Sequence, residues 1–362
     1  GLYEKILKKN EGHKHFVLHD GPPYANGEIH AGHALNKILK DTIVRYKAMK
    51  GFYAPFIPGY DTHGMPTEKK AIEKLGLDRS KIPVTKFRDT CREFTTNYKD
   101  IQTEGFKRLG VLGDWAHPYI TYDHATEARQ IGVFGDMYKK GYIYKGLKPV
   151  YWCTDCETAL AEAEIEYKDV TGESIYVKFP VEDSKGLFDK KDTYMVIWTT
   201  TPWTLMNNVA LCVNPNETYI KASSQGYNFI VAKALANNIL GNDYEVLEEY
   251  KGKDLEFVEY EQLLPFVKPD KKAFFVTCDD YVTMSDGTGI VHIAPAFGQD
   301  DYNVGRKYNL PVLCSVGEDG KYTEGPWKGM VVFDADIEII KYLKTNDKLF
   351  KKIKMTHSYP HC

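Results

Sequence analysis

Residues 19–33 read HDGPPYANGEIHAGH, and this stretch decides how the first part of the chain folds. The residues just before it, 15–19, are apolar in pattern and predict a short buried strand. From about residue 31, apolar side chains recur at helical spacing until Gly51 ends the predicted helix: Leu35, Ile38, Leu39, Ile43, Tyr46 and Met49. A second strand is predicted at 52–57. The order strand, loop, helix, strand indicates an α/β fold, whose parallel sheet binds ligands at the carboxyl ends of its strands.

The pattern changes along the rest of the chain. Residues 85–145 are charged and helical in spacing, whereas the apolar runs from residue 174 to about 293 are short and rich in β-branched and aromatic residues. Strands are predicted there at 194–198, 209–213, 227–231, 273–277 and 289–293, with one helix near 232–240. Residues 334–345 again predict a helix, and 351–362 form an extended basic segment. The sequence therefore predicts a second, mostly β domain.

Composition excludes several classes of protein. A chain of 362 residues with 43% hydrophobic and 27% charged residues is typical of a globular protein with two or three domains. No stretch approaches the roughly 18 consecutive apolar residues of a membrane helix, so we expect no membrane partner. A net charge of −3 gives no general attraction for nucleic acid, which local basic patches would have to bind. Seven cysteines fit a reducing compartment better than a disulfide framework, so we expect a cytoplasmic protein.

Two histidines mark the start of the first long helix. A loop between a strand and a helix offers backbone amides and the positive end of the helix dipole to an anion. His30 and His33 are three residues apart and share one helix face, and Gly32 leaves room for a flat base. Two imidazoles aimed at an α-phosphate could stabilise the charge that develops during adenylyl transfer. A pair of solvent-exposed histidines at the helix start, or a metal-binding pair, are the alternatives.

Three motifs together resemble one family. HDGPPYANG at 19–27, HAGHALNK at 30–37 and PGYDTHGMPTE at 58–68 resemble the class I aminoacyl-tRNA synthetases, and among them the isoleucine enzymes, along the whole chain. Ala31 stands where the His-x-Gly-His signature usually has Ile. The resemblance implies that Gly21, Pro22 and Asp61 border the isoleucine pocket, with Asp61 holding the α-ammonium group. It also implies that ATP, with magnesium, is bound by Asn26, His30, Gly32 and His33. A helix cap or turn is the alternative role for Asp61.

The resemblance also implies a domain organisation. Residues 1–168 would form the N-terminal half of a Rossmann-like catalytic domain, 169–350 an inserted, mostly β editing domain, and 351–362 a segment returning to the catalytic domain. The second class I signature, Lys-Met-Ser-Lys-Ser, does not occur in these residues. We therefore expect the chain to be an N-terminal fragment that does not complete aminoacylation alone.

Two further segments resemble the editing insertion of the isoleucine, valine and leucine enzymes: WTTTPWT at 198–204 and GTGIVHIAPAFGQDD at 287–301. The resemblance implies that the pocket is lined by Thr199, Thr200, Thr201 and Asn208, that His292 limits the space for the side chain and that Asp301 binds the α-ammonium group. Such a pocket is needed because one methylene is worth only about 1–3 kcal/mol, a limit for which the isoleucine enzymes are themselves the standard example. Phe297 stands where many relatives have His, so no general base is assigned. Read singly, the threonine run is ordinary strand sequence and the Gly-x-Gly loop an ordinary turn.

Cysteines near both ends of the second domain suggest a metal. Cys153 and Cys156 have the spacing of a zinc knuckle, and Cys362, with or without His361, supplies a third ligand where tetrahedral zinc needs four. Zinc is expected in the complete enzyme, and small buried thiols are the alternative.

The expected function is isoleucine–tRNA ligase acting as a monomer on isoleucine, ATP and isoleucine tRNA, with hydrolysis of mischarged valyl-tRNA. A valine enzyme, a nucleotidyltransferase with the same histidine loop and a stand-alone deacylase are the alternatives.

Overall fold

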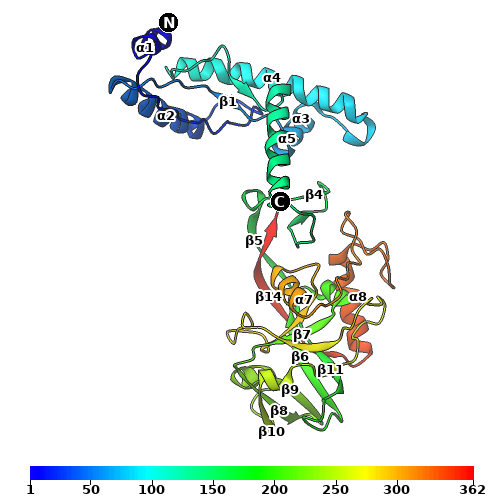
Figure 1. Cartoon of the computed structure of the whole chain (residues 1–362). Coiled ribbons are helices and arrows are strands. Elements are labelled where there is room, and N and C mark those ends of the chain that lie inside the picture. Colours follow the sequence, from blue (N-terminus) through cyan, green and yellow to red (C-terminus); the bar gives the residue numbers. More distant parts are fainter. The chain divides into compact units, whose positions relative to one another are not determined.

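The structure is a computed structural model that describes all residues from Gly1 to Cys362. The chain divides into an N-terminal unit, Gly1–Lys145, and a C-terminal unit, Gly146–Cys362 (Figure 1). The predicted boundary after residue 168 lies inside β5, Glu166–Asp183. None of the helices combines the length and the apolar character that crossing a membrane requires.

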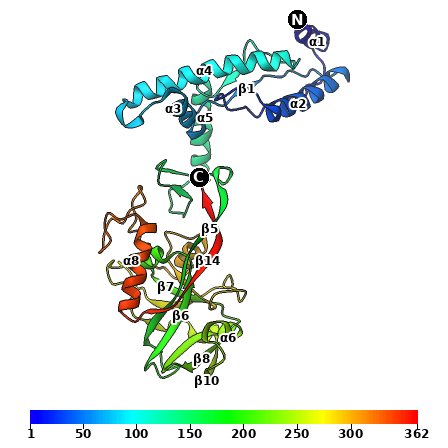
Figure 2. The same ribbon diagram turned by 180° about the vertical axis from the view of Figure 1, so that it is seen from behind.

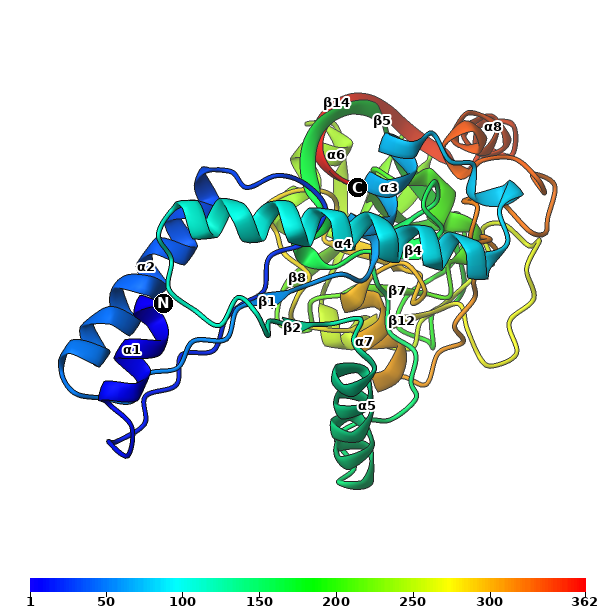
Figure 3. The same ribbon diagram turned by 90° about the horizontal axis from the view of Figure 1, so that it is seen from above.

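The N-terminal unit is mostly helical. The predicted helix from residue 31 is confirmed as α2, which begins after the cap residue His30 and ends at Met49. The helical pattern at 85–145 corresponds to α4 and α5, and Figure 3 shows α4 as the long cyan helix of this unit. The elements are α1 (Leu2–Lys9), α2 (Ala31–Met49), β1 (Gly59–Tyr60), α3 (Met65–Leu75), η1 (Arg79–Lys81), α4 (Val84–Arg108), β2 (Tyr119–Ile120) and α5 (His124–Lys139).

The two strands predicted around α2 are wrong. Residues 15–19 and 52–57 are extended but share only the parallel bridge between His15 and Tyr53, and the only ladder in this unit joins β1 to β2. Side chains take the backbone groups that a ladder would use. The Phe56 N–H donates to the Tyr3 hydroxyl at 3.0 Å, and this hydroxyl donates to the Phe56 carbonyl at 3.1 Å.

The apolar stripe of α2 is also not its buried side within this chain. Leu35 is 64% exposed and Met49 is 80% exposed, whereas Lys37 is only 2% exposed. The Lys37 ammonium lies over the rings of Phe56 and Phe106, at 5.9 and 5.2 Å from their centroids. Lys37 and Val44 are therefore the buried residues of α2, and hydrophobic periodicity cannot predict a lysine in this role.

The C-terminal unit is built on a ten-stranded sheet in the order β10-β8-β9-β6-β5-β11-β12-β7-β13, with β14 paired to β5. The mostly β character and the five predicted strands are confirmed as β6, β7, β9, β12 and β13, and the predicted helices as η4 with α6 and as α8. Its strands are β3 (Trp152–Cys153), β4 (Thr158–Ala159), β5 (Glu166–Asp183), β6 (Thr193–Thr199), β7 (Ala210–Val213), β8 (Thr218–Ser224), β9 (Tyr227–Ala232), β10 (Glu245–Lys251), β11 (Glu259–Tyr260), β12 (Phe275–Cys278), β13 (Ile290–Ile293) and β14 (Leu349–His361). Its helices are η2 (Glu162–Glu164), η3 (Pro202–Asn207), η4 (Lys233–Leu235), α6 (Ala236–Leu240), η5 (Gly252–Leu255), α7 (Gln299–Lys307) and α8 (Val332–Thr345).

The basic segment at the end of the chain is β14. It pairs antiparallel with β5 from Leu349 opposite Val177 to His361 opposite Glu166, so the two strands form one long ribbon (Figure 2). The inner end of β5 also pairs with β6, from Ile175 opposite Thr199 to Pro180 opposite Tyr194. The ribbon therefore continues directly into the sheet that carries the threonine segment.

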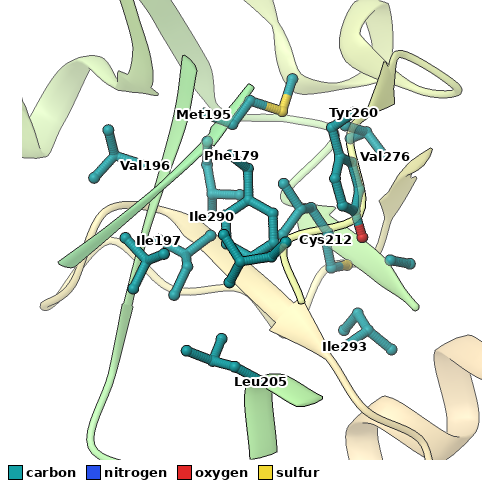
Figure 4. Close-up of a cluster of buried hydrophobic side chains, with 14 of the residues drawn as sticks. Phe179, Met195, Val196, Ile197, Leu205, Cys212, Tyr260, Val276, Ile290 and Ile293 are labelled. Carbon is teal, nitrogen blue, oxygen red and sulfur yellow. The ribbon is translucent and has the colours of Figure 1, made fainter. Parts of the chain in front are cut away.

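The core of this unit is closely packed around the inner strands. Figure 4 shows Phe179, Met195, Cys212, Tyr260, Ile290 and Ile293 gathered in one cluster. All six side chains are buried. At about 25 cal/mol per Å² of apolar surface, burial of this kind supplies most of the free energy that holds the strands in register. This rigid sheet positions the loops that follow β6 and β13.

Candidate functional sites

The two predicted ATP-binding histidines lie against each other at the start of α2. Their ring centroids are 3.9 Å apart and the planes are tilted by 29°. The Gly32 N–H donates to His30 Nδ1 at 3.1 Å, and the His30 N–H donates to His33 Nδ1 at 3.3 Å. A Cβ on Gly32 would lie 3.0 Å from the His30 ring, so this glycine permits the close approach.

These hydrogen bonds decide where the imidazole protons lie. A ring nitrogen that accepts from a backbone N–H carries no proton, so each neutral imidazole has its proton on Nε2. Burial lowers the pKa of His33, and His30 and Lys37 lower it further. The arrangement can therefore offer two adjacent Nε2–H donors to an anion at the first turn of α2.

A buried carboxylate joins the segments around these histidines. Asp20 Oδ2 accepts from the Lys37 ammonium and Oδ1 accepts from the Lys40 ammonium at 2.7 Å, both on α2. Asp20 Oδ2 also accepts from the Gly59 N–H, and the Asp20 carbonyl accepts from the Tyr119 hydroxyl at 2.6 Å. The Asp20 side chain is fully buried, and removing one partner of such a cluster costs several kcal/mol because a charge is left unpaired. Asp20 thus fixes the loop that begins at Gly21 relative to both α2 and β1.

The predicted amino-acid-binding residues come together in the same unit. The Asp61 N–H donates to the Pro23 carbonyl at 2.8 Å, and the Ala25 N–H donates to the Asp61 carbonyl at 2.9 Å. The loop that holds Gly21 and Pro22 therefore runs beside Asp61, whose half-buried carboxylate accepts from the His63 N–H at 3.3 Å. Asn26 instead donates its side-chain amide to the Pro66 carbonyl at 3.2 Å.

The C-terminal unit contains a cavity of about 370 Å³ between the end of β6 and the loops around β13. Four residues of the predicted editing site line it: Thr199, Thr200, His292 and Asp301. The other lining residues are Trp198, Tyr281, Val282, Thr283, Asp286, Gly287, Thr288, Gly289, Ile290 and Val291. Gly289 has a φ of +73°, and a Cβ there would lie 2.4 Å from the Cβ of Ala232. Only glycine fits this position, where the loop enters β13.

Two predicted editing residues lie outside the cavity wall. Asn208 is buried, and its side chain donates to the Ala210 carbonyl at 2.9 Å and accepts from the Tyr260 hydroxyl at 2.7 Å. Thr201 hydrogen-bonds through its hydroxyl to Thr199 at 3.2 Å and to Thr204 at 3.4 Å. The structure thus places Asn208 in the core of the sheet and Thr201 behind the threonine that faces the cavity.

Burial sets the charge of the two titratable predicted residues in the cavity. It lowers the pKa of His292 to about 4, so the ring is neutral at neutral pH, and Nε2 lies 3.0 Å from the Thr204 hydroxyl. Burial raises the pKa of Asp301 to about 6, although the Ala294 N–H donates to Oδ2 at 3.0 Å and opposes the shift. The cavity thus contains one carboxylate near its titration point and no cationic imidazole at neutral pH.

Sequence reasoning missed two aromatic residues of this cavity. The Tyr281 hydroxyl and the Trp198 indole N–H are both buried and have no hydrogen-bond partner in the protein. Trp198 directly precedes the threonine run, but an aromatic residue at the end of a strand reads equally well as core. Tyr281 lies in a polar loop, where the sequence offers no signal.

The predicted metal ligands converge in the same unit. β3 and β4 form a small hairpin, and the thiols of Cys153, Cys156 and Cys362 lie within 4.8 Å of one another. His361 is not part of this group, since its Nδ1 lies 2.9 Å from the Tyr359 carbonyl. Three convergent thiols suit a metal that prefers soft ligands, such as zinc.

Known proteins resemble the chain along its whole length. It is 49% identical over 367 residues to an isoleucine–tRNA ligase of Desulforamulus reducens, covering 100% of this chain, and 52% identical over 366 residues to that of Lactobacillus acidophilus, covering 99%. The chain spans 39% of the length of each relative. Among solved structures, the P. knowlesi cytosolic leucyl-tRNA synthetase editing domain matches 49% of this chain and 95% of its own with a TM-score of 0.40 and 14% identity.

One family model covers most of the chain. The model described as tRNA synthetases class I (I, L, M and V) matches residues 1–300, which include the histidine pair, the Asp61 segment and the threonine segment. The chain therefore belongs to the class I tRNA synthetases of this family.

Proposed function

We propose that this chain is the N-terminal part of an isoleucine–tRNA ligase that makes isoleucyl-adenylate from isoleucine and ATP and passes the acyl group to tRNA. The observation that supports this most is about 50% identity along the whole chain to isoleucine–tRNA ligases. The pairing of His30 with His33 and the pairing of Asp61 with the loop at Pro23 and Ala25 agree with it. Because the chain spans 39% of those relatives, we propose that the remainder of the ligase completes the activation site.

In this proposal four residues of the N-terminal unit have defined roles in the activation reaction. The isoleucine carboxylate attacks the α-phosphate of ATP, the bond to pyrophosphate breaks, and charge develops on the α-phosphate oxygens. The Nε2–H groups of His30 and His33 donate to those oxygens, and magnesium bound with ATP would neutralise the other phosphates. Asp61 holds the α-ammonium group, and Asp20 keeps the two segments in place.

We further propose that the C-terminal unit hydrolyses mischarged valyl-tRNA in its cavity. Asp301 binds the α-ammonium group, the hydroxyls of Thr199 and Thr200 orient water and the ester, and His292 limits the room for the amino-acid side chain. Water adds to the ester carbonyl carbon, the bond to the ribose oxygen breaks, and that oxygen takes the proton. An ester is activated enough for orientation and hydrogen bonding to carry this reaction.

The remaining assignments stay proposals. Residues 1–168 form the N-terminal half of the catalytic domain, 169–350 the inserted editing domain and 351–362 the return segment. Zinc in the complete ligase is held by Cys153, Cys156 and Cys362 with a fourth ligand from outside this chain. The ligase acts in the cytoplasm as a monomer.

The pH dependence of hydrolysis tests the cavity. We expect valyl-tRNA hydrolysis by this chain to rise as the pH increases through about 6, because Asp301 must lose its proton to bind an ammonium group and burial raises its pKa to about 6. His292 stays neutral over this range because its pKa is lowered to about 4. Initial rates between pH 5 and 8, corrected for release without protein, give the profile.

A matched variant separates the effect of Asp301 from that of Asp336, a second carboxyl group with a raised pKa. Burial raises the pKa of Asp336 to about 7, although the Trp203 N–H donates to it and opposes the shift, and Asp336 does not line the cavity. Asp336→Asn should therefore keep the rise near pH 6. A flat profile in the wild-type chain would contradict the role of Asp301.

A further inference from the structure

Tyr281 is the one cavity residue with a buried hydroxyl that the protein leaves without a partner. It lies between β12 and β13, and its ring packs against the hydrophobic core while the residue lines the cavity together with Asp301. Burying a hydroxyl without a hydrogen bond destabilises the folded state. Other buried tyrosines of this unit avoid that cost, since the Tyr219 hydroxyl donates to the Gly289 carbonyl at 2.6 Å and the Tyr322 hydroxyl to the Trp203 carbonyl at 2.6 Å.

We propose that Tyr281 is a catalytic residue of this cavity, whose hydroxyl donates a hydrogen bond to the carbonyl oxygen of the bound aminoacyl ester. This inference rests on the proposed editing function and assigns one donor of its oxyanion site.

The chemistry of the ester places its carbonyl near Tyr281. In an α-amino ester the carbonyl carbon is bonded to the carbon that bears the ammonium group. A carboxylate that holds the ammonium therefore brings the carbonyl oxygen to the same part of the cavity. Asp301 and Tyr281 both line the cavity, and the Asp301 carboxylate is among the groups that raise the pKa of the phenol.

The state of the phenol suits a donor and not a base. Burial raises the pKa of Tyr281, and Cys212, Asp301, Asp300 and Asp279 raise it further. Tyr281 thus keeps its proton throughout the reaction. Water supplies the oxygen that adds to the carbonyl carbon, the ribose oxygen leaves and takes the water proton, and the Tyr281 O–H stabilises the negative charge that forms in between.

The test compares two tyrosine-to-phenylalanine variants of this chain. Tyr281→Phe removes the unpartnered hydroxyl, and Tyr308→Phe removes a hydroxyl that donates to Glu256 and accepts from the Cys278 N–H at 3.0 Å outside the cavity. For Tyr281→Phe we expect kcat for valyl-tRNA hydrolysis to fall by about 10²-fold, as for loss of one oxyanion donor, with KM changed less than threefold. The midpoint of denaturant unfolding should stay the same or rise, since an unsatisfied polar group is removed. Tyr308→Phe should do the reverse, with full activity and a lower midpoint.

The outcomes separate this inference from the function on which it rests. If the wild-type chain hydrolyses valyl-tRNA and Tyr281→Phe keeps kcat within twofold, Tyr281 is not the donor, and the editing function stands. A loss of activity together with a lowered unfolding midpoint would show that Tyr281 is only structural and would also overturn the inference. If the wild-type chain hydrolyses nothing, the proposed function of the unit fails first.

Discussion

Replacing His30 with asparagine or His33 with alanine in the complete ligase is expected to lower isoleucine-dependent pyrophosphate exchange by about 10²-fold or more for each donor removed. The Nδ1 atom of each ring accepts a hydrogen bond from a backbone N–H at the start of α2. This leaves the Nε2–H group as the donor to the α-phosphate. The ring centroids are only 3.9 Å apart, so in this proposal both donors serve one phosphate group.

The choice of asparagine at position 30 separates catalysis from helix capping. His30 is the N-cap of α2, and asparagine is among the best N-cap residues, so His30→Asn keeps the cap and loses only the distant donor. His13→Ala is the control, because His13 lies in the same unit and contacts the Gly51 carbonyl at 2.8 Å. Exchange at the wild-type rate in both active-site variants would contradict the assignment.

Asp301→Ala is expected to lower valyl-tRNA hydrolysis by this chain by about 10²-fold or more. Truncating one partner of a buried charge pair costs about 2–5 kcal/mol, and 1.4 kcal/mol corresponds to tenfold. The loss should appear mainly above pH 6, where the wild-type carboxylate is ionised. Measuring initial rates at pH 7.5 over a range of valyl-tRNA concentrations gives the effect.

The neighbouring residue provides the control. Asp300 is exposed, also lies in the first turn of α7 and does not line the cavity, so Asp300→Ala should keep the wild-type rate. The Asp301 variant should not unfold, because a buried carboxyl with a raised pKa binds its proton more tightly in the folded state. Its charged form therefore opposes folding above about pH 6. Equal hydrolysis rates for Asp300→Ala and Asp301→Ala would contradict the proposed role of Asp301.

Local sequence patterns predicted the elements that have a regular apolar pattern and a clear boundary residue. The helix at Ala31–Met49 and the strand at Ile290–Ile293 have strong apolar periodicity and glycine at an end, so their positions could be predicted to within a few residues. The strand β10, Glu245–Lys251, could not, since it carries three glutamates and lies at the edge of the sheet. β5 lies inside the sheet but was missed because its outer half is exposed and polar.

Site residues could be predicted from the sequence only where they belong to a recognisable motif. Thr199, Thr200, His292 and Asp301 come from two motifs, and the structure brings all four to one cavity. Asn208 lies near the same motif, but its amide bonds to Tyr260, which is 52 residues away in sequence. The role of Asp20 depends equally on distant partners, since Lys37, Gly59 and Tyr119 reach it from three segments. Long-range hydrogen bonds of this kind leave no trace in local sequence.

The measurement that tests the central claim most directly is hydrolysis of valyl-tRNA and isoleucyl-tRNA, both made on isoleucine tRNA, by this chain. The account predicts that valine is released at least tenfold faster than isoleucine, because the cavity bounded by His292 admits the smaller side chain, and that Asp301→Ala abolishes the difference. Equal release of both amino acids would contradict an editing pocket specific for valine. No release by this chain or by the complete ligase would contradict the hydrolytic function of the C-terminal unit.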